Sequence, residues 1–183
     1  MRNLKKNLQA KHKEDKTKAV YFFDEARFGT HSKIGHGWFV KGSRTPIKVK
    51  LGFQNFYLYS AVDPKSGEDF TLILPSVNTD CMNVFLSKMA EEVHNKSIII
   101  VMDGAGWHHS KDLEIPGNIE IIYLPPYSPE LNPVERMWLY IKQRTIRNKI
   151  YDTIGDLEEV ICNFLCSKLS PTILKSVCCV DYL

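Results

Sequence analysis

The 183-residue sequence predicts an α/β domain, and three observations support this fold class. Two continuous apolar runs, AVYFF at 19–23 and IIIVM at 98–102, are typical of strands buried on both faces of a sheet. Between and after these runs, apolar residues recur with the spacing of amphipathic helices. No internal repeat or linker interrupts the pattern. Residues 19–183 are therefore expected to form one domain.

The first half of the chain is predicted to consist mainly of strands. Residues 1–18 read as a basic leader, poorly ordered or the remnant of a missing N-terminal region. The strand at 19–23 is expected to end at Asp24, and residues 29–45 to form a Gly-rich, basic loop or hairpin. Strands at 56–62 and 70–74 follow, joined by the turn DPKSGED.

Helices alternate with strands in the second half. A helix is predicted over 78–94, with a stripe formed by Val84, Phe85, Met89 and Val93. The strand at 98–102 ends at Asp103, and a short strand at 119–124 leads into a proline-rich loop. A helix from Pro133 to Ile150 is expected to bury Val134, Trp138 and Ile141. The last predicted helix, 153–168, buries Leu157, Val160, Ile161, Phe164 and Leu165.

The net charge is only +3, but the charge is unevenly distributed. Residues 1–18 carry seven Lys or Arg against two acids, and 33–50 and 136–149 are basic without any acid. Such runs are commonly solvated faces, yet three of them favour a polyanionic partner. No apolar run approaches the ~20 residues of a membrane span. The five cysteines lack zinc spacing, and we interpret the Cys178–Cys179 pair as incidental. A cytoplasmic protein is expected.

Glu135 has both a structural and a functional interpretation. Asn132, Pro133 and Glu135 have the spacing of a capping box, in which the glutamate binds a backbone N–H. Alternatively, Glu135 approaches Asp24 and Asp103. If the two apolar strands are parallel neighbours, both aspartates emerge at one edge of the sheet, where open α/β sheets build their sites. The prolines would hold Glu135 near this edge at low entropic cost.

Three carboxylates at one place predict a divalent cation. Close carboxylates raise one another's pKa, and a bound cation relieves the repulsion. All-oxygen ligands suit Mg²⁺ or Mn²⁺, and a pair of such ions stabilises both the attacking and the leaving oxygen in phosphoryl transfer. Two alternatives stay open at this point: Asp103 precedes a glycine, as turn residues often do, and spacing does not decide whether Asp24 or Glu25 points inward.

Four stretches carry a family resemblance: FFDEARF (22–28), GWFVKGSRTP (37–46), IIIVMDGAGWHHS (98–110) and LPPYSPELNPVERMW (124–138). Over residues 19–165 the chain resembles the catalytic domain of DDE transposases of the mariner superfamily, in its bacterial insertion-sequence branch. The resemblance implies an RNase H-like fold, a mixed five-stranded sheet flanked by helices.

The resemblance also implies roles for individual residues. Asp24, Asp103 and Glu135 match the catalytic carboxylates that bind Mg²⁺ or Mn²⁺, expected as two ions. His108 matches a histidine beside the metal site, although a polar surface histidine is an equal alternative. A further set is expected to contact DNA: Trp38, Lys41, Arg44, Arg136, Lys142, Arg144 and Arg147.

The implied activity is cleavage of DNA at the ends of a mobile element and strand transfer into target DNA. The implied partners are the terminal inverted repeats, the target DNA and a second copy of the chain. Gly104 stands where the family usually has Asn, which predicts reduced activity, and DNA-binding modules usually precede the domain, so the chain reads as a fragment or half of a split element. The alternatives are a non-catalytic remnant that inhibits a full transposase and another RNase H-like nuclease.

Overall fold

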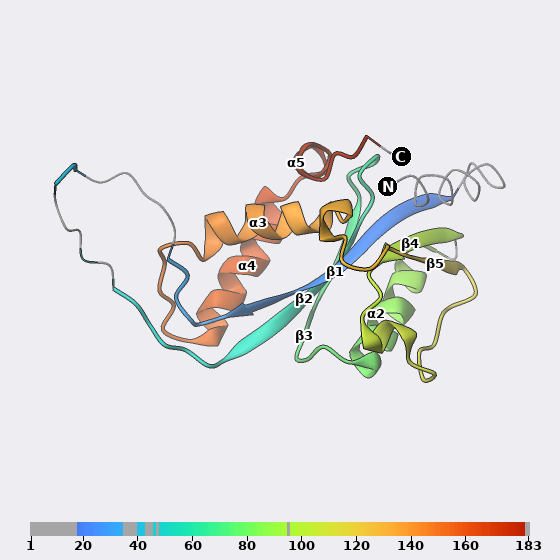
Figure 1. Cartoon of the computed structure of the whole chain (residues 1–183), viewed down its shortest axis with the longest axis horizontal. Coiled ribbons are helices and arrows are strands. Elements are labelled where there is room, and N and C mark those ends of the chain that lie inside the picture. Colours follow the sequence, from blue (N-terminus) through green and yellow to red (C-terminus); the bar gives the residue numbers. More distant parts are fainter. Residues whose placement is uncertain (1–17, 35–39, 43–45, 47, 95, 182–183) are drawn as a thin grey trace.

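The fold is described from a computed structural model, for residues 18–34, 40–42, 46, 48–94 and 96–181. The leader up to residue 17, Trp38 and Arg44 lie outside these residues. A five-stranded sheet has the order β3-β2-β1-β4-β5 (Figure 1). The strands are β1 (Ala19–Gly29), β2 (Asn55–Val62), β3 (Asp69–Leu74), β4 (Ile98–Met102) and β5 (Ile119–Tyr123).

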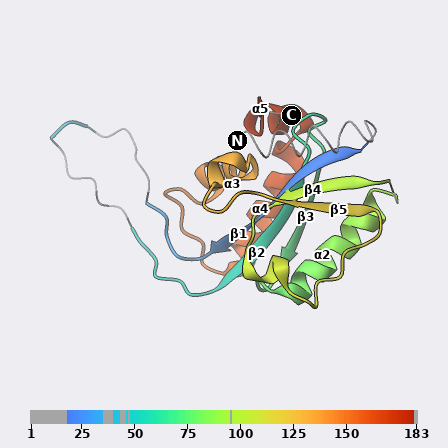
Figure 2. The same ribbon diagram turned by 45° about the vertical axis from the view of Figure 1, so that its right-hand side comes forward.

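The sheet is mixed, as predicted. β1 pairs in parallel with β4, and β4 with β5, whereas β1, β2 and β3 form antiparallel pairs. The two wholly apolar runs are therefore parallel neighbours at the centre of the sheet. Figure 2 shows β1 and β4 side by side, with β5 beyond β4.

β1 is longer than predicted and does not end at Asp24. Its parallel ladder with β4 reaches Phe22, paired with Val101, but its antiparallel ladder with β2 continues to Gly29, paired with Asn55. Beyond Phe22, β1 thus loses its partner β4 on one side but stays paired with β2 on the other. Asp24 lies inside a strand, just past the point where β4 ends.

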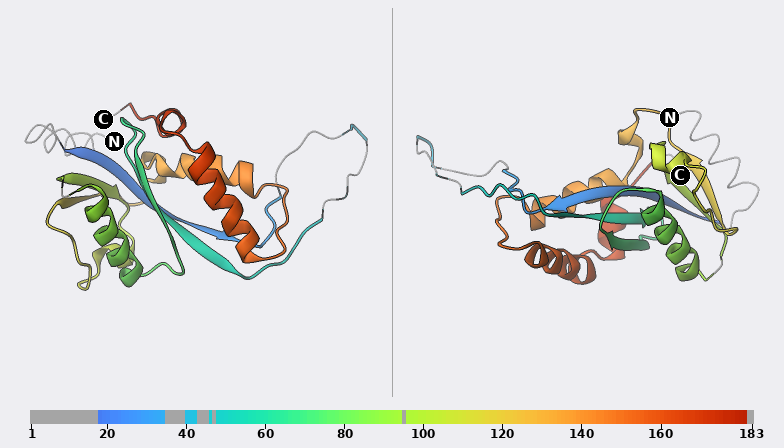
Figure 3. Two further views of the ribbon diagram at one scale, coloured as in Figure 1. Left: turned by 180° about the vertical axis from the view of Figure 1, so that it is seen from behind. Right: turned by 90° about the horizontal axis from the view of Figure 1, so that it is seen from below.

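Helices cover both faces of the sheet, and the alternation of side chains along β1 decides which residues meet them. Val20, Phe22 and Phe28 join the core under α3 (Val134–Thr145), α4 (Ile154–Lys168) and α5 (Pro171–Val177). Tyr21 and Phe23 join the core under α2 (Thr79–Glu92). Figure 3 shows α4 and α2 on separate parts of the molecule.

The helices follow the predicted pattern with specific corrections. Phe85 and Met89 are buried in α2, but Val84 is 49% exposed and does not belong to the apolar stripe. α4 begins with a capping box between Thr153 and Asp156. α5 was not predicted, because a seven-residue helix gives too little periodicity to detect. None of the described helices is both long and apolar enough to cross a membrane.

α3 departs from its prediction at both ends. It buries Val134, Trp138 and Ile141 as expected, but it ends at Thr145 rather than Ile150. Beyond its end, Asn148 adopts a left-handed conformation (φ 57°), and its N–H donates to the carbonyl of Lys33. This contact turns the chain out of the helix. Arg147 therefore lies after α3 and not on it.

The predicted capping box at Asn132 is wrong. The side chain of Asn132 is buried. Its Nδ2 donates to the backbone carbonyl of Phe23 at 2.9 Å, and its Oδ1 accepts from the N–H of Val134 at 3.2 Å. The local bond to Val134 is thus present, but the reciprocal half of the capping box is not, because the backbone N–H of Asn132 donates to the carbonyl of Pro129 at 2.9 Å rather than to Glu135. The side chain of Glu135 is exposed in the first turn of α3.

Candidate active site

A cavity of about 680 Å³ lies where β4 ends beside β1 and where the proline loop enters α3. Its lining includes all three predicted carboxylates, Asp24, Asp103 and Glu135, from three different elements. The remaining lining residues come from the turn after β4, the end of β5 and the proline loop: Gly104, Ala105, His109, Tyr123, Leu124, Pro125, Pro126, Tyr127, Ser128, Pro129 and Asn132.

The strand register brings the two aspartates level with each other. Asp24 and Asp103 each lie two positions beyond the paired residues Phe22 and Val101. Asp24 is mostly buried, and its Oδ2 accepts a hydrogen bond from the indole Nε1 of Trp138 at 2.9 Å. The Asp103 side chain is 58% exposed, and its Oδ1 accepts from the N–H of Ala105 at 3.1 Å.

The cavity holds excess negative charge. Burial, followed by the charges of Glu135 and Glu25, raises the pKa of Asp24 to about 8, against the lowering effect of the Trp138 hydrogen bond. A carboxyl group with such a pKa is costly to ionise in the absence of a cation. The position of Asp24 therefore favours a positively charged ligand.

The proline loop is held to the sheet close to Asp24. Asn132 binds the carbonyl of Phe23, the neighbour of Asp24, so the start of α3 is tied to β1 at this point. Earlier in the same loop, Tyr127 has φ 57° and a fully exposed side chain. A bulky residue in the left-handed region is uncommon, and this conformation turns the phenol ring outward at the mouth of the cavity.

His108 lies beside the site but does not line the cavity. It is 1% exposed, which excludes the surface alternative. Its Nδ1 lies 2.9 Å from Oδ1 of Asp103, and its Nε2 lies 3.0 Å from Oε1 of Glu25. Burial lowers the pKa of His108, but these two carboxylates and the Asp103 carbonyl outweigh it, so the pKa is raised overall.

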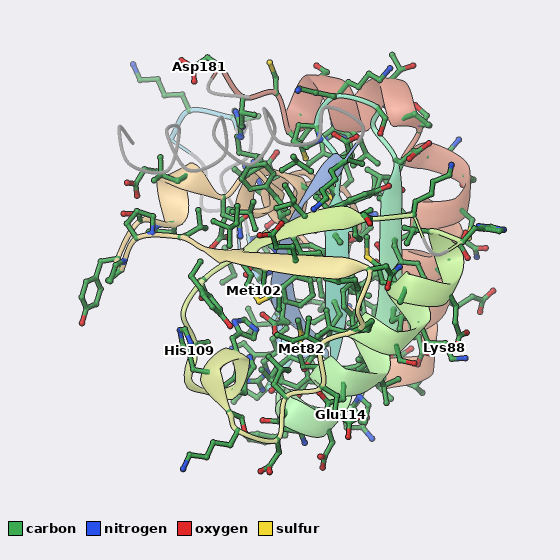
Figure 4. All side chains as sticks on the ribbon, turned by 90° about the vertical axis from the view of Figure 1, so that its right-hand side faces the viewer. Met82, Lys88, Met102, His109, Glu114 and Asp181 are labelled. Carbon is green, nitrogen blue, oxygen red and sulfur yellow. The ribbon has the colours of Figure 1, made fainter. Side chains whose placement is uncertain are left out.

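The alternation of side chains along β1 decides where Asp24 and Glu25 point, which spacing alone left open. Asp24 faces α3, whereas Glu25 faces the turn of η1 (Gly106–His109), where Trp107 and His108 bind it. Figure 4 labels His109 on this turn and Met102 at the end of β4. Both acidic side chains of the DE pair therefore point inward, toward opposite faces of the sheet.

The predicted DNA-binding residues divide into several groups. Lys142 lies near the site: burial and Lys33 lower its pKa, and Glu135 and Asp24 partly offset this. Arg136 donates to the carbonyl of Cys179, and the guanidinium of Arg144 stacks over Tyr140 at 3.5 Å. Lys41 is exposed on the connection between β1 and β2, and it is not among the residues that line the cavity.

Gly104 tolerates a side chain. A Cβ atom at this position would lie 3.1 Å from Nε2 of His109, an exposed side chain that can move by a few tenths of an ångström. We expect Gly104→Asn to change the free energy of unfolding by less than about 0.5 kcal/mol, measured by urea denaturation. Gly67→Asn is the control: its φ is +74° and the Cβ would lie 2.2 Å from the Pro171 carbonyl oxygen, so it should destabilise strongly. Equal effects of the two substitutions would contradict this.

The donor chemistry of the cavity fits a divalent cation. Three carboxylates face it, and burial together with the charges of Glu135 and Glu25 raises the pKa of Asp24, so a cation would stabilise its ionised form. Within the described residues, no three His, Cys, Asp or Glu side chains are already grouped as metal ligands.

Several residues at the site were not identified from the sequence as participants. Trp138 was assigned only to the core, and Glu25 was left as an alternative to Asp24. The period-two alternation of β1 could have separated Asp24 from Glu25, but nothing local indicates that Trp107 and His108 meet Glu25. His109 and Tyr127 carried no signal beyond their motifs.

The family model described as a DDE superfamily endonuclease matches residues 19–158. An uncharacterised protein of Sinorhizobium fredii is 35% identical over 107 residues, 58% of this chain and 79% of that protein. The 39 kDa protein of insertion element IS630 from Shigella sonnei is 23% identical over 152 residues, and the Tc3 transposase of Caenorhabditis elegans is 26% identical over 154. The chain spans 44% and 47% of the length of these last two proteins.

Solved structures of the Mos1 transposase share the fold. A Mos1 paired-end complex with the left transposon end has a TM-score of 0.70 at 15% identity, covering 96% of this chain and 56% of that one. A Mos1 paired-end complex with Mn has a TM-score of 0.71. The predicted RNase H-like fold, with its mixed five-stranded sheet, is thereby confirmed. The similarity to the IS630 and Tc3 proteins agrees with the mariner branch that the motifs predicted, and the chain belongs to the DDE superfamily endonucleases.

Proposed function

We propose that this chain cleaves DNA strands at the ends of a mobile element and joins them to target DNA, with a divalent cation as cofactor. The observation that carries the proposal is the convergence of Asp24, Asp103 and Glu135 on one cavity. Each comes from a different element, and the register of β1 and β4 sets two of them level. Metal-dependent cleavage of DNA by this family requires carboxylates that are close enough together to bind the same cations.

Asp24, Asp103 and Glu135 would hold Mg²⁺ or Mn²⁺, as two ions in the active state. When bound, the metal supplies positive charge that stabilises the attacking and leaving oxygens of phosphoryl transfer. Mos1 paired-end complexes with Mn and with Mg support this choice of cation. Trp138 holds Asp24 in place through its hydrogen bond, and Asn132 keeps the start of α3 beside it.

Double-stranded DNA is the proposed substrate. Although burial lowers the pKa of Lys142 overall, the charges of Glu135 and Asp24 act to raise it, which places this lysine near both carboxylates and makes it a candidate to bind a phosphate at the cavity. The Mos1 structures contain transposon-end DNA in a paired-end complex, which supports a dimer of this chain on two DNA ends. Such a reaction would take place on bacterial DNA in the cytoplasm.

Nicking of supercoiled plasmid in Mn²⁺ tests the proposal. We expect the wild-type chain to nick, and Asp103→Ala and Glu135→Gln to lose nicking by at least ~100-fold. Glu130→Gln is the matched control, because Glu130 lies on the same loop as an exposed residue outside the cavity lining. Nicking that survives both site substitutions would refute the assignment of the site.

The same assay separates the alternatives. An RNase H-like nuclease of another kind would prefer an RNA–DNA hybrid over plasmid DNA in a substrate panel. A non-catalytic remnant would not nick, but it would inhibit an active parent transposase in a transposition assay. Either result would replace the proposed activity while leaving the fold unchanged.

Tyr127→Ala is expected to weaken DNA binding by about tenfold, because an exposed aromatic ring at the mouth of the cavity offers a stacking surface worth ~1–3 kcal/mol per base. The side chain is fully exposed, so the melting temperature should not change. Fluorescence anisotropy with labelled DNA measures the affinity. Tyr127→Phe, which retains the ring, should bind as the wild type does; a matching loss in that variant would exclude stacking.

A further inference from the structure

The strongest unassigned feature is a buried carboxylate on the face of β1 opposite Asp24. The Glu25 side chain is 8% exposed. Its Oε1 accepts from Nε1 of Trp107 at 3.2 Å and lies 3.0 Å from Nε2 of His108. Burying a carboxylate is costly unless it is paired, and here the imidazole of His108 is the pairing group.

His108 joins this carboxylate to Asp103. The ring is 1% exposed and lies between two carboxylates, with Nδ1 2.9 Å from Oδ1 of Asp103. The same nitrogen lies 3.0 Å from the carbonyl oxygen of Asp103. Both ring nitrogens lie within hydrogen-bond distance of oxygen atoms of Glu25 and Asp103, so the ring is held in one orientation between them. Glu25, His108 and Asp103 thus form a continuous chain across the end of β4.

The turn that carries His108 is itself held firmly. The Tyr123 hydroxyl donates to the carbonyl of His108 at 2.6 Å, and the N–H of His108 donates to the carbonyl of Ala105 at 2.9 Å. The fixed end of the chain is therefore the buried Glu25, and the free end is the half-exposed Asp103 carboxylate at the cavity. The buried Glu25 therefore holds the His108 ring in place, and the ring in turn holds the exposed carboxylate of Asp103.

We propose that Glu25 is a positioning residue that, through His108, fixes the Asp103 carboxylate toward the cavity and so strengthens binding of the divalent cation. The proposal rests on the proposed function, since it takes Asp103 as a metal ligand. Outer partners that orient a metal ligand typically contribute 10–100-fold to metal affinity. Glu25 does not line the cavity and so is not itself a ligand.

Mn²⁺ binding in the absence of DNA, followed by electron paramagnetic resonance, tests the proposal without relying on activity. We expect Glu25→Gln to weaken Mn²⁺ binding about tenfold, since the amide keeps the shape but loses the charge that holds His108. Glu68→Gln is the control for the lost charge: its exposed carboxylate binds the Tyr21 hydroxyl and does not line the cavity. The control should bind Mn²⁺ within twofold of the wild type.

A double-mutant cycle shows whether Glu25 acts through His108. If it does, adding Glu25→Gln to His108→Asn should weaken Mn²⁺ binding by less than twofold beyond His108→Asn alone. Independent, multiplying effects would overturn the proposal, and so would a folded Glu25→Gln variant that binds Mn²⁺ normally. If Glu25→Gln does not fold, Glu25→Asp replaces it, because the shorter side chain keeps the charge but withdraws it from His108.

The wild type and Asp103→Asn separate this proposal from the proposed function. Mn²⁺ binding that depends on Asp103 but not on Glu25 would overturn only the positioning role. Mn²⁺ binding that is insensitive to Asp103→Asn would overturn both, because no ligand would then remain for Glu25 to orient.

Discussion

Asp24→Asn is expected to abolish metal-dependent DNA nicking and, at the same time, to stabilise the metal-free protein above pH 8. The two effects have one cause. The carboxylate is mostly buried beside the charges of Glu135 and Glu25, so its ionisation is costly in the folded state. An amide keeps the acceptor for Trp138 and removes the charge. The substitution therefore removes a proposed metal ligand and, at the same time, a buried charge that destabilises the folded protein.

The gain in stability from Asp24→Asn is expected to increase with pH. The pKa of Asp24 is raised from 3.8 to about 8 in the folded protein, so the folded state binds more protons than the unfolded state between these values. Stability therefore falls as the pH rises through this window, and the cost is fully present above pH 8. We expect Asp24→Asn to match the wild type near pH 4 and to be more stable by about 5 kcal/mol at pH 8.5, since each unit of pKa difference corresponds to ~1.4 kcal/mol.

Thermal unfolding of the metal-free protein at a series of pH values measures this effect. A gain of about 5 kcal/mol corresponds to a rise of ~10–20 °C in melting temperature for a domain of this size. Asp112→Asn, at an exposed position, controls for the loss of one charge and should show no such trend. A stability difference that does not change with pH would contradict the burial of an ionisable Asp24.

Trp138→Ala is expected to cost about 3–5 kcal/mol of stability, the range for large-to-small changes in a core. The ring is 2% exposed, packs edge-on against Phe28 with centroids 6.2 Å apart, and donates to Asp24. Its removal opens a cavity between α3 and β1 and takes away the hydrogen bond that holds Asp24. Urea denaturation measures the loss, and a cost below ~1 kcal/mol would show that the site collapses without strain.

Trp138→Phe separates the hydrogen bond from the packing. Phenylalanine fills most of the space but has no N–H to donate to Asp24. The variant should lose about 1–2 kcal/mol, the cost of a missing bond to a charged group. Because the Trp138 bond lowers the pKa of Asp24, this loss should be larger at pH 8.5 than at pH 4. Equal losses at both values would assign the whole effect of Trp138 to packing.

Much of the fold could be predicted because its strongest signals are local. Continuous apolar runs identified the central strands, and regular spacing identified α2, α3 and α4. The ends of these elements were less predictable. β1 continues past Asp24 because β2 pairs with it there, and α3 stops early because Asn148 binds Lys33. Both boundaries depend on residues far away in the chain.

The candidate site shows the same division. The motifs identified Asp24, Asp103 and Glu135, and the structure places all three on one cavity. The predicted capping box is only half formed: the Asn132 side chain accepts from the N–H of Val134, but the backbone N–H of Asn132 donates to the carbonyl of Pro129 and not to Glu135. The spacing predicts which groups can meet, but the conformation of the proline loop decides which acceptor reaches this N–H.

The sequence by itself determined the class of fold and the order of the main elements, because local apolar patterns carry both. Its resemblance to a known family in four short motifs indicated the family and the three candidate carboxylates. Only the tertiary structure decided that Asp24 faces Trp138 while Glu25 faces His108, and that His108 connects Glu25 to Asp103. These contacts join β1, the turn after β4 and α3. Such contacts follow from how the helices pack on the two faces of the sheet, which no local pattern specifies.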